Sequence, residues 1–245
     1  MKVIGPFRHL CRMLRRASIE FPLSGTLNYG YSSKPDGVFI PKPLYNSFES
    51  VAIAVNKRKT HDTLALVNLS PPLACMGTVT DNKYAFIYKP LYGMKSKGIY
   101  FSNKAEPVYG YLCQEYVPIK DEYRIIVAGS TVVAIMRKVK YKDDADEHLR
   151  GSEVGWEWRK RKPSHNDKAE AAAVLATRAI GLDVGGADVG IGYDHKPYVF
   201  EVNAASWLNK ILAGLIMKVL YINDLAAKGV RPRPTYVDPH CYVKD

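Results

Sequence analysis

Residues 181–203 have the sequence GLDVGGADVGIGYDHKPYVFEVN, and this stretch decides how the rest of the chain is interpreted. It predicts two short strands, at 187–191 and 198–202, that are joined by a tight turn. Successive side chains of a strand point to opposite faces, so Glu201 and Asn203 are expected to share one face of the second strand. Two oxygen-bearing side chains should therefore lie next to each other at the end of this strand.

Asp188 lies in the first of these strands, and a short antiparallel connection brings it beside Glu201 and Asn203. Three hard oxygen ligands on neighbouring strands suit Mg²⁺, which binds a few carboxylates together with phosphate oxygens and water. A solvated face of the sheet is the alternative. However, Glu201 belongs to the otherwise apolar run 198–205, where a carboxylate is costly unless it is paired or bound to a metal. We therefore predict a metal site formed by these three side chains.

The segment KPLYGMKSKG, at residues 89–98, is a candidate phosphate-binding loop. Its first lysine ends a predicted strand at 84–89, and the backbone N–H groups of a loop with two glycines can face an anion together with the ammonium group. The segment lacks the Walker A pattern, so a plain hairpin loop is an equal alternative. The candidate residues are Lys89, Gly93, Lys95, Ser96 and Gly98.

A third candidate is QEYV, at residues 114–117, which ends a predicted strand at 111–117. Exposed backbone after a strand can hydrogen-bond the edge of an adenine ring, and a carboxylate a few residues later, here Glu122, can hold ribose hydroxyls. Such a short pattern also occurs in sequences without this function. It supports a nucleotide site only in combination with the two segments above.

The remaining sequence predicts short helices and strands. We expect a strand at 2–5, a helix at 7–17, a loop at 24–36, a strand at 37–41, the start of a helix at 47–55, a helix at 60–68, a β-hairpin of strands 124–128 and 131–137, a loop at 143–162, a helix at 167–180 with Asn166 or Asp167 as its cap, a helix at 207–228 and an extended tail.

Taken in order, these motifs resemble those of the ATP-grasp superfamily, in particular the RimK-like carboxylate–amine (amino-acid) ligases. The resemblance covers about residues 55–215, and its two specific motifs place Glu201 thirteen residues after Asp188. The motifs are Asn56 to Thr60, Lys89-Pro90 with its glycine loop, Gln114 to Val117, Glu122 to Arg124, Val132 to Arg137, Gly181 to Val189 and Phe200 to Asn203.

The resemblance implies the ATP-grasp fold, an α+β fold in which two α+β lobes clasp ATP. A short, truncated pre-ATP-grasp lobe would occupy residues 1–54 and the nucleotide lobe residues 55–118. The metal lobe would follow at 119–228, and an extended tail at 229–245.

The resemblance also implies a role for each matching residue. Lys57 and Lys89 would contact the phosphates of ATP, and the loop of Gly93, Lys95, Ser96 and Gly98 would close over them. Gln114, Glu115, Tyr116 and Val117 would recognise adenine, and Glu122 would hold the ribose. Asp188, Glu201 and Asn203 would bind two Mg²⁺ ions, with Mn²⁺ as an alternative ion.

Two arginines complete the implied site. Arg137 would stabilise the acyl phosphate and the tetrahedral intermediate, and Arg124 would assist it. Arg137 ends the predicted strand at 131–137, so we expect its cation to point into the cleft and to face the metal site.

These roles imply an ATP-dependent ligase that joins a carboxylate to an amine through an acyl-phosphate intermediate. That chemistry needs no side-chain nucleophile, and the sequence offers no Ser–His or Cys–His arrangement for one. A kinase that phosphorylates a hydroxyl on the same fold and a non-catalytic nucleotide-binding module are the alternatives. The stretch HLRG, at 148–151, departs from the asparagine and paired glycines usual in the family, so the substrates do not follow from the resemblance.

The chain of 245 residues has a formal net charge of +11, which favours an anionic partner. We expect a small-molecule or peptide substrate with a carboxylate and an amine, an acidic acceptor, and nucleic acid as a further anionic partner. No run of about eighteen apolar residues and no signal peptide is found, so we expect a cytoplasmic protein that does not enter membranes. The four cysteines form no CxxC pair, which argues against a zinc motif or a disulfide framework.

Overall fold

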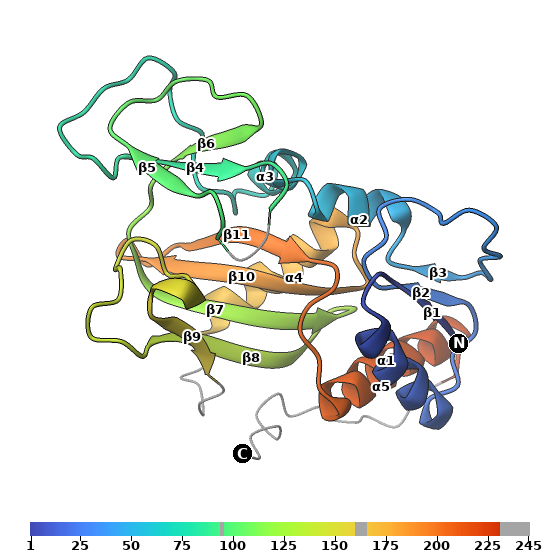
Figure 1. Ribbon diagram of the computed structural model, residues 1–245. Coiled ribbons are helices and arrows are strands. Elements are labelled where there is room, and N and C mark those ends of the chain that lie inside the picture. Colours follow the sequence, from blue (N-terminus) through green and yellow to red (C-terminus); the bar gives the residue numbers. More distant parts are fainter. Residues whose placement is uncertain (94–95, 160–165, 231–245) are drawn as a thin grey trace.

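The structure is a computed structural model that describes residues 1–93, 96–159 and 166–230 (Figure 1). Its centre is a five-stranded sheet with the order β11–β10–β7–β8–β9, in which all neighbouring strands are antiparallel. The strands are β7 (Ile119–Ala128), β8 (Thr131–Lys140), β9 (Trp156–Arg159), β10 (Val184–Gly192) and β11 (Pro197–Asn203). The predicted hairpin and both predicted strands within 181–203 are therefore confirmed.

Helix α4 (Asp167–Ile180) covers one face of this sheet. It begins where the side chain of Asn166 accepts a hydrogen bond from the N–H of Ala169 at 3.1 Å, and it ends at Gly181, which has a left-handed φ of 83°. Alanines dominate the helix face on the sheet, and their small side chains let helix and strands approach closely. The buried alanines are Ala169, Ala172, Ala173 and Ala176. The functional site uses part of the opposite face of the sheet.

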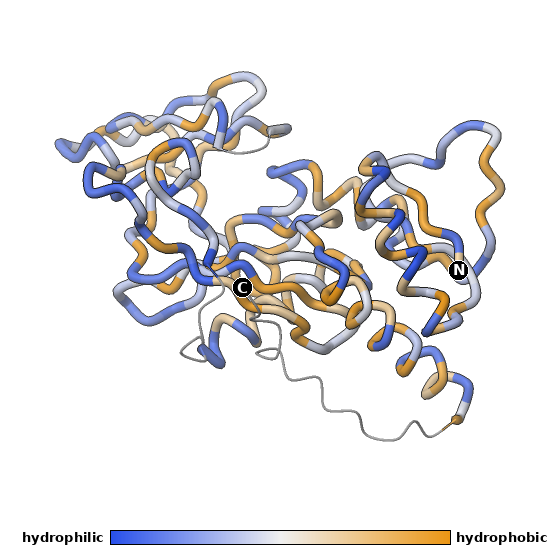
Figure 2. The backbone as a smooth tube through the Cα atoms, turned by 60° about the horizontal axis from the view of Figure 1, so that its bottom comes forward, coloured by the Kyte–Doolittle hydropathy of each residue, from blue (hydrophilic) through white to orange (hydrophobic). Residues whose placement is uncertain are grey.

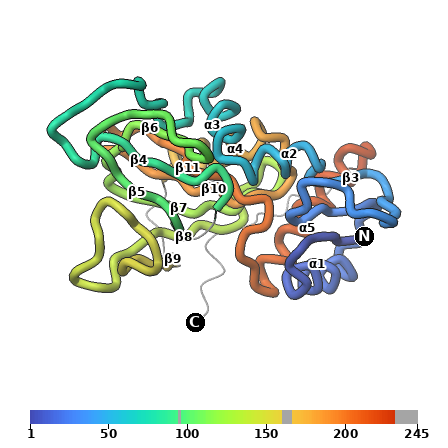
Figure 3. Tube along the Cα trace, turned by 45° about the horizontal axis from the view of Figure 1, so that its top comes forward, coloured from blue at the N-terminus to red at the C-terminus, as the bar shows by residue number. Residues whose placement is uncertain are grey.

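A second, three-stranded antiparallel sheet, β5–β4–β6, lies over the β11 and β10 edge of the central sheet, as the views in Figures 1 and 3 agree. It consists of β4 (Phe86–Pro90), β5 (Tyr100–Ser102) and β6 (Tyr111–Glu115). Two helices precede it, α2 (Phe48–Ala54) and α3 (Lys57–Ala65), which are capped by the side chains of Ser47 and Asn56. The N–H of Lys57 donates to the carbonyl of Leu91 at 3.0 Å, so the start of α3 is fixed beside the loop that follows β4.

A third, parallel sheet is formed by β1 (Lys2–Ile4), β2 (Thr26–Asn28) and β3 (Leu44–Tyr45). Helix α1 (Arg8–Glu20) packs against α5 (Lys210–Ala227), although the two helices are separated by most of the chain. Leucines of α1 share one hydrophobic cluster with residues of α5 and with the central sheet. In Figure 2 the colour of the tube changes repeatedly along the helices near the N-terminus, as expected for amphipathic helices.

Several predicted elements are wrong. No strand forms at 37–41, and the predicted loop at 24–36 contains β2, whose residues are completely buried. The predicted loop at 143–162 contains a short 3₁₀ helix (Ser152–Val154) and β9. In these places tertiary pairing with a neighbouring strand overrides local composition. The predicted extended tail consists mostly of residues 231–245, which lie outside the described part of the chain. The lobe boundaries at 54, 118 and 228 stay predictions.

Within the described ranges, no helix combines the length and the apolar character that crossing a membrane requires.

Candidate active site

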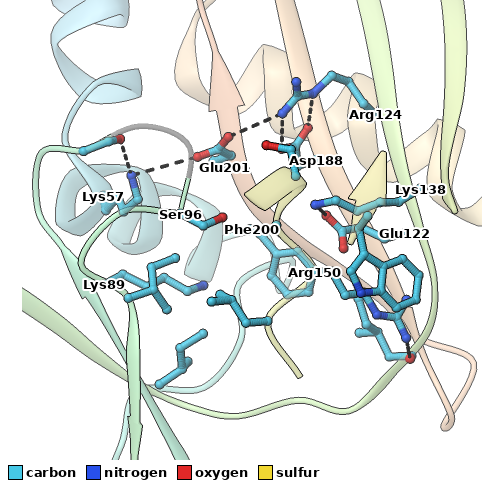
Figure 4. Close-up of a pocket in the computed structure, with 18 of the residues that line it drawn as sticks. Lys57, Lys89, Ser96, Glu122, Arg124, Lys138, Arg150, Asp188, Phe200 and Glu201 are labelled. Carbon is cyan, nitrogen blue, oxygen red and sulfur yellow. Dashed lines mark hydrogen bonds and ion pairs between the residues drawn. The ribbon is translucent and has the colours of Figure 1, made fainter. Parts of the chain in front are cut away.

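A cavity of about 570 Å³ lies between the second sheet and the open face of the central sheet (Figure 4). Its wall contains charged residues of both signs together with apolar side chains. The predicted site residues on its wall are Lys57, Lys89, Gly93, Ser96, Glu115, Tyr116, Val117, Glu122, Arg124, Asp188, Glu201 and Asn203. Gln114, Gly98 and Arg137 are not part of it, and Lys95 lies outside the described residues.

The three predicted metal ligands lie together on this wall. Asp188 and Glu201 are directly opposite each other in the β10–β11 pair, and Asn203 donates from Nδ2 to Oε1 of Glu201 at 2.9 Å. The pairing contains a β-bulge at Phe200, so the Phe200 ring and the Glu201 carboxylate both reach the cavity wall although they are neighbours in sequence. Asp188, Glu201 and Asn203 therefore lie side by side, as the alternation of side chains along the strands predicted.

Two cations balance these carboxylates. Arg124 donates to both oxygens of Asp188, from Nε and Nη2, at 2.6 Å each, and its Nη2 lies 3.7 Å from Glu201. The ammonium of Lys57 lies 3.9 Å from the other oxygen of Glu201. Burial raises the pKa of Asp188 to about 7, and the Arg124 guanidinium opposes this rise. Burial also acts to raise the pKa of Glu201, but the hydrogen bond from Asn203 and the charge of Lys57 outweigh it and hold that pKa below its usual value.

The donor set fits Mg²⁺ bound together with a triphosphate. No cluster of three or more His, Cys, Asp or Glu side chains that could hold an ion occurs in the described ranges, so the chain provides two carboxylates and one amide. Nucleotide-bound Mg²⁺ needs only one or two carboxylates, because phosphates and water complete its octahedron. Asn203 uses its amide nitrogen for Glu201, which leaves its carbonyl oxygen for an ion.

Lys89 and the loop after it form the wall opposite the carboxylates. Lys89 is only 8% exposed, its ammonium lies 5.1 Å from the centre of the Phe200 ring, and burial lowers its pKa to about 8. Lys57 donates to the carbonyl of Gly93 at 3.0 Å, which holds the loop against α3. Lys57 therefore lies beside Glu201, and Lys89 and Ser96 line the same cavity, as Figure 4 shows.

The segment after β6 supplies an apolar end of the cavity. Glu115, Tyr116 and Val117 line it, whereas Gln114 is buried behind the sheet, where its amide donates to the carbonyl of Pro71 at 3.5 Å. The N–H of Val117 makes no hydrogen bond with any residue that the structure describes. A free backbone donor in an apolar slot suits the ring nitrogen of a purine. The apolar side chains of the cavity wall include Ile87, Ile99, Ile119 and Phe200.

Glu122 has a partner that the sequence did not suggest. Its carboxylate accepts a hydrogen bond from Lys138 at 2.8 Å, and the side chains of both residues are at least 88% buried. The Lys138 ammonium also lies 4.5 Å from the centre of the Trp158 ring, and Arg124 lies 4.6 Å from the same ring. Lys138 and Trp158 thus belong to the site, and sequence reasoning missed both.

The predicted orientation of Arg137 is wrong. Its guanidinium pairs with Asp121 on the opposite face of the sheet, outside the cavity. A regular hairpin from Ala128↔Thr131 would place Arg137 opposite Glu122, but a β-bulge shifts the register between Ile126 and Val127. One extra residue on β8 exchanges the two faces of the strand beyond it. Lys138 consequently occupies the position that was expected for Arg137.

The loop after β8 closes the cavity from a third side. His148 stacks on Tyr84, in the turn before β4, with ring centres 3.7 Å apart, and Leu149 and Arg150 continue along the cavity wall. The carboxylate of Asp146 accepts hydrogen bonds from the N–H groups of His148 and Leu149 at 2.8 and 3.0 Å. In the sequence, only the departure of HLRG, at 148–151, from the family pattern indicated that this loop is unusual.

A cavity between two antiparallel sheets that is lined by both carboxylates and lysines is typical of the ATP-grasp class of nucleotide-binding proteins. The family model of the RimK-like ATP-grasp domain matches residues 51–220, and the chain belongs to this family, which uses ATP and Mg²⁺. The predicted α+β, ATP-grasp fold is therefore confirmed. No curated protein sequence matches the chain significantly.

Solved structures agree with the fold. D-alanine–D-alanine ligase from Bacillus anthracis aligns over 93% of this chain and 98% of its own, with a TM-score of 0.60 and 11% identity. The D-cycloserine synthetase DcsG aligns over 74% and 73%, with a TM-score of 0.53 and 21% identity. The ATP-grasp ligase PsnB, complexed with a phosphomimetic variant of its minimal precursor, Mg and ADP, aligns over 72% of this chain with a TM-score of 0.52 and 21% identity. This chain spans 60% of the length of PsnB.

Proposed function

We propose that the protein is an ATP-dependent ligase that joins a carboxylate to an amine through an acyl phosphate. The observation that carries this proposal is the pair Asp188 and Glu201, which share one cavity wall with Lys57 and Lys89 and are flanked by Arg124. A carboxylate does not react with an amine at neutral pH because oxide is a poor leaving group. Transfer of a phosphoryl group to the carboxylate supplies a leaving group that departs readily.

In the proposed reaction a substrate carboxylate oxygen attacks the γ-phosphorus of ATP, and ADP leaves. Lys57 and Lys89 hold the phosphates in line for this attack. Mg²⁺, two ions in our proposal and replaceable by Mn²⁺, neutralises charge on the transferring phosphoryl group when it is bound at Asp188, Glu201 and Asn203. The amine then attacks the acyl carbon, phosphate leaves, and the amine loses a proton. Arg124 lies at the carboxylate end of the cavity and stabilises the oxyanion of that step.

The substrates in this proposal are a small molecule or peptide with a carboxylate, and an amine, with an acidic acceptor. Support comes from the cations Arg124, Lys138 and Arg150 on the cavity wall and from the net charge of +11. The neighbours DcsG and PsnB are similar in fold, and PsnB is complexed with a precursor. A cytoplasmic location and the division into lobes at 54, 118 and 228 are parts of the same proposal.

The experiment traps the acyl phosphate. The protein is incubated with Mg-ATP, hydroxylamine and, in turn, each standard amino acid and short glutamate-rich peptides. We expect a hydroxamate with at least one carboxylate, together with equal amounts of ADP and phosphate. A stable phosphorylated alcohol without any hydroxamate would instead establish a kinase. ADP binding without turnover on any substrate in the panel would favour the non-catalytic module.

Lys89→Ala is expected to weaken ADP binding by about 1–3 kcal/mol, the scale of a lost charge-assisted hydrogen bond. Because the pKa of Lys89 is lowered to about 8, the wild-type affinity should also fall as the pH rises from 7 to 9 and the ammonium loses its proton. Lys89→Arg keeps its charge over this range and should abolish that dependence. Calorimetry with Mg-ADP at three pH values measures both effects. An unchanged affinity of Lys89→Ala would remove Lys89 from the phosphate site.

A further inference from the structure

Trp158 contacts two cations of the cavity wall. It lies on β9 directly opposite Lys138 on β8, and the Lys138 ammonium lies 4.5 Å from the centre of its indole ring. The guanidinium of Arg124, which belongs to β7, lies 4.6 Å from the centre of the same ring. An aromatic face attracts a cation at such distances, and the face of Trp attracts it most strongly. One side chain of β9 therefore restrains charged groups of two other strands.

The salt bridge with Asp188 leaves the orientation of Arg124 incompletely fixed. Nε and Nη2 of Arg124 each donate to one oxygen of Asp188 at 2.6 Å, which aligns the guanidinium with the carboxylate. However, the last torsion of an aspartate side chain is soft, so the two planar groups can turn together. The guanidinium also lies over the Trp158 ring, and this contact opposes the rotation.

The third nitrogen of the Arg124 guanidinium depends on this orientation. Nη1 makes no hydrogen bond with any residue that the structure describes, and it is not fully buried. Because Arg124 lines the cavity, its Nη1 is accessible to a substrate there. The guanidinium is planar, so turning it moves Nη1 relative to the reacting atoms.

The indole ring is itself held in place. Trp158 packs against the hydrophobic cluster that α1, α5 and the central sheet share, and Lys138 beside it is fixed by Glu122 at 2.8 Å. We propose that Trp158 is a positioning residue, which holds the Arg124 guanidinium so that Nη1 points to the oxyanion formed when the amine attacks. The presence of that oxyanion rests on the proposed function, whereas the orientation of Arg124 does not. A side chain that only fills space is the alternative.

The kinetics of Trp158 variants separate the two roles. Trp158→Leu has no aromatic face and should slow product formation roughly 10–100-fold, because a catalytic group that is slightly displaced acts far less well. Trp158→Phe keeps a ring face, although a weaker one, and should recover most of the rate. The affinity for Mg-ADP should stay near the wild-type value in both variants. The rate is measured with the carboxylate found by hydroxamate trapping.

The loss of rate should depend on Arg124. An Arg124→Lys background has no planar group to orient, so adding Trp158→Leu should cost much less there than in the wild type. Tyr109→Leu is the control for the loss of an aromatic ring, because Tyr109 is fully exposed and lies outside the cavity, and it should keep the wild-type rate. Thermal melting shows whether each variant is folded, and Trp158→Met replaces Trp158→Leu if the latter unfolds.

Nuclear magnetic resonance tests the orientation of Arg124 without any substrate. The Nε–H of Arg124 donates to Asp188 and belongs to a group that lies over the indole ring, so the ring current should move its resonance to lower frequency. The signal is identified by its absence in Arg124→Lys. Trp158→Leu should move it to higher frequency, and Tyr109→Leu should leave it in place.

An unchanged Arg124 signal in Trp158→Leu overturns the proposal. A wild-type rate in that variant also overturns it, as does an equal loss of rate in Trp158→Leu and Trp158→Phe, which would show a role in packing alone. A loss of ADP affinity as large as the loss of rate has the same meaning, because the effect would then arise at the nucleotide. A wild type that forms no product with any substrate contradicts the proposed function instead, and the Arg124 signal then decides whether Trp158 fixes the guanidinium.

Discussion

Replacing Glu201 by Gln should lower the rate of product formation by on the order of 10³ or more. The neutral amide of Gln offers no negative charge to hold the Mg²⁺ ion that binds the triphosphate. Glu201 lies opposite Asp188 in the β10–β11 pair, so Asp188→Asn should have a similar effect. Glu201→Gln is nearly isosteric and should leave the fold intact, whereas Asp188→Asn also breaks the buried pair with Arg124, so its stability must be measured. Release of phosphate, measured with the carboxylate found by hydroxamate trapping, gives the rate.

The matched control is Glu106→Gln. Glu106 is an exposed carboxylate between β5 and β6 that pairs with Lys104 at 3.0 Å, and the side chains of both residues are 54% exposed. Such surface pairs contribute little, so its rate and melting temperature should stay near those of the wild type. Binding of Mn²⁺ in the presence of ADP, followed by electron paramagnetic resonance, should weaken in Glu201→Gln and not in the control. Wild-type turnover in either metal-site variant would reject the assignment.

Arg124→Met should slow product formation by on the order of 10²–10³, the usual cost of losing one contact to an oxyanion, and change ADP affinity much less. Arg137→Met should behave like the wild type, because Arg137 pairs with Asp121 outside the cavity. The comparison separates the two arginines that the sequence placed in one role. A large loss of rate in Arg137→Met together with normal rates in Arg124→Met would restore the original assignment.

Arg124→Met also carries a structural cost that must be measured. It leaves Asp188 buried without its partner, and breaking a buried ion pair in this way typically costs about 3–5 kcal/mol. Burial already raises the pKa of Asp188 to about 7, and removal of the guanidinium should raise it further. Denaturant unfolding will show the loss of stability. Arg124→Lys, which keeps a cation near Asp188, provides the folded variant for kinetics if Arg124→Met is unstable.

The sequence predicted the carboxylate wall of the site well because its geometry is local. Asp188, Glu201 and Asn203 belong to one hairpin, and the alternation of side chains is enough to bring them together. The fold followed from the order of motifs, and helix α4 followed from its cap, its alanines and Gly181. In each case the information lies within a few residues of the feature that it determines.

The parts that could not be predicted depend on register or on distant partners. The β-bulge opposite Ile126 and Val127 has no clear sequence signal, yet it decides whether Arg137 or Lys138 faces the cavity. Strand β2 contains only three residues, and its partners β1 and β3 lie far along the chain. The loop with Arg150 is positioned by the stacking of His148 on Tyr84, which lies far from it in the chain, just before β4.

The packing of α1 on α5 has a consequence for biosynthesis. Leu10 and Leu14 belong to the same hydrophobic cluster as Leu212 and Ile216, so they are covered by residues that are translated much later. At about 5–20 residues per second, those leucines emerge roughly 10–40 s before α5 exists to cover them. Helix α1 therefore acquires its neighbour α5 only late in synthesis, and until then it presents an apolar surface to chaperones.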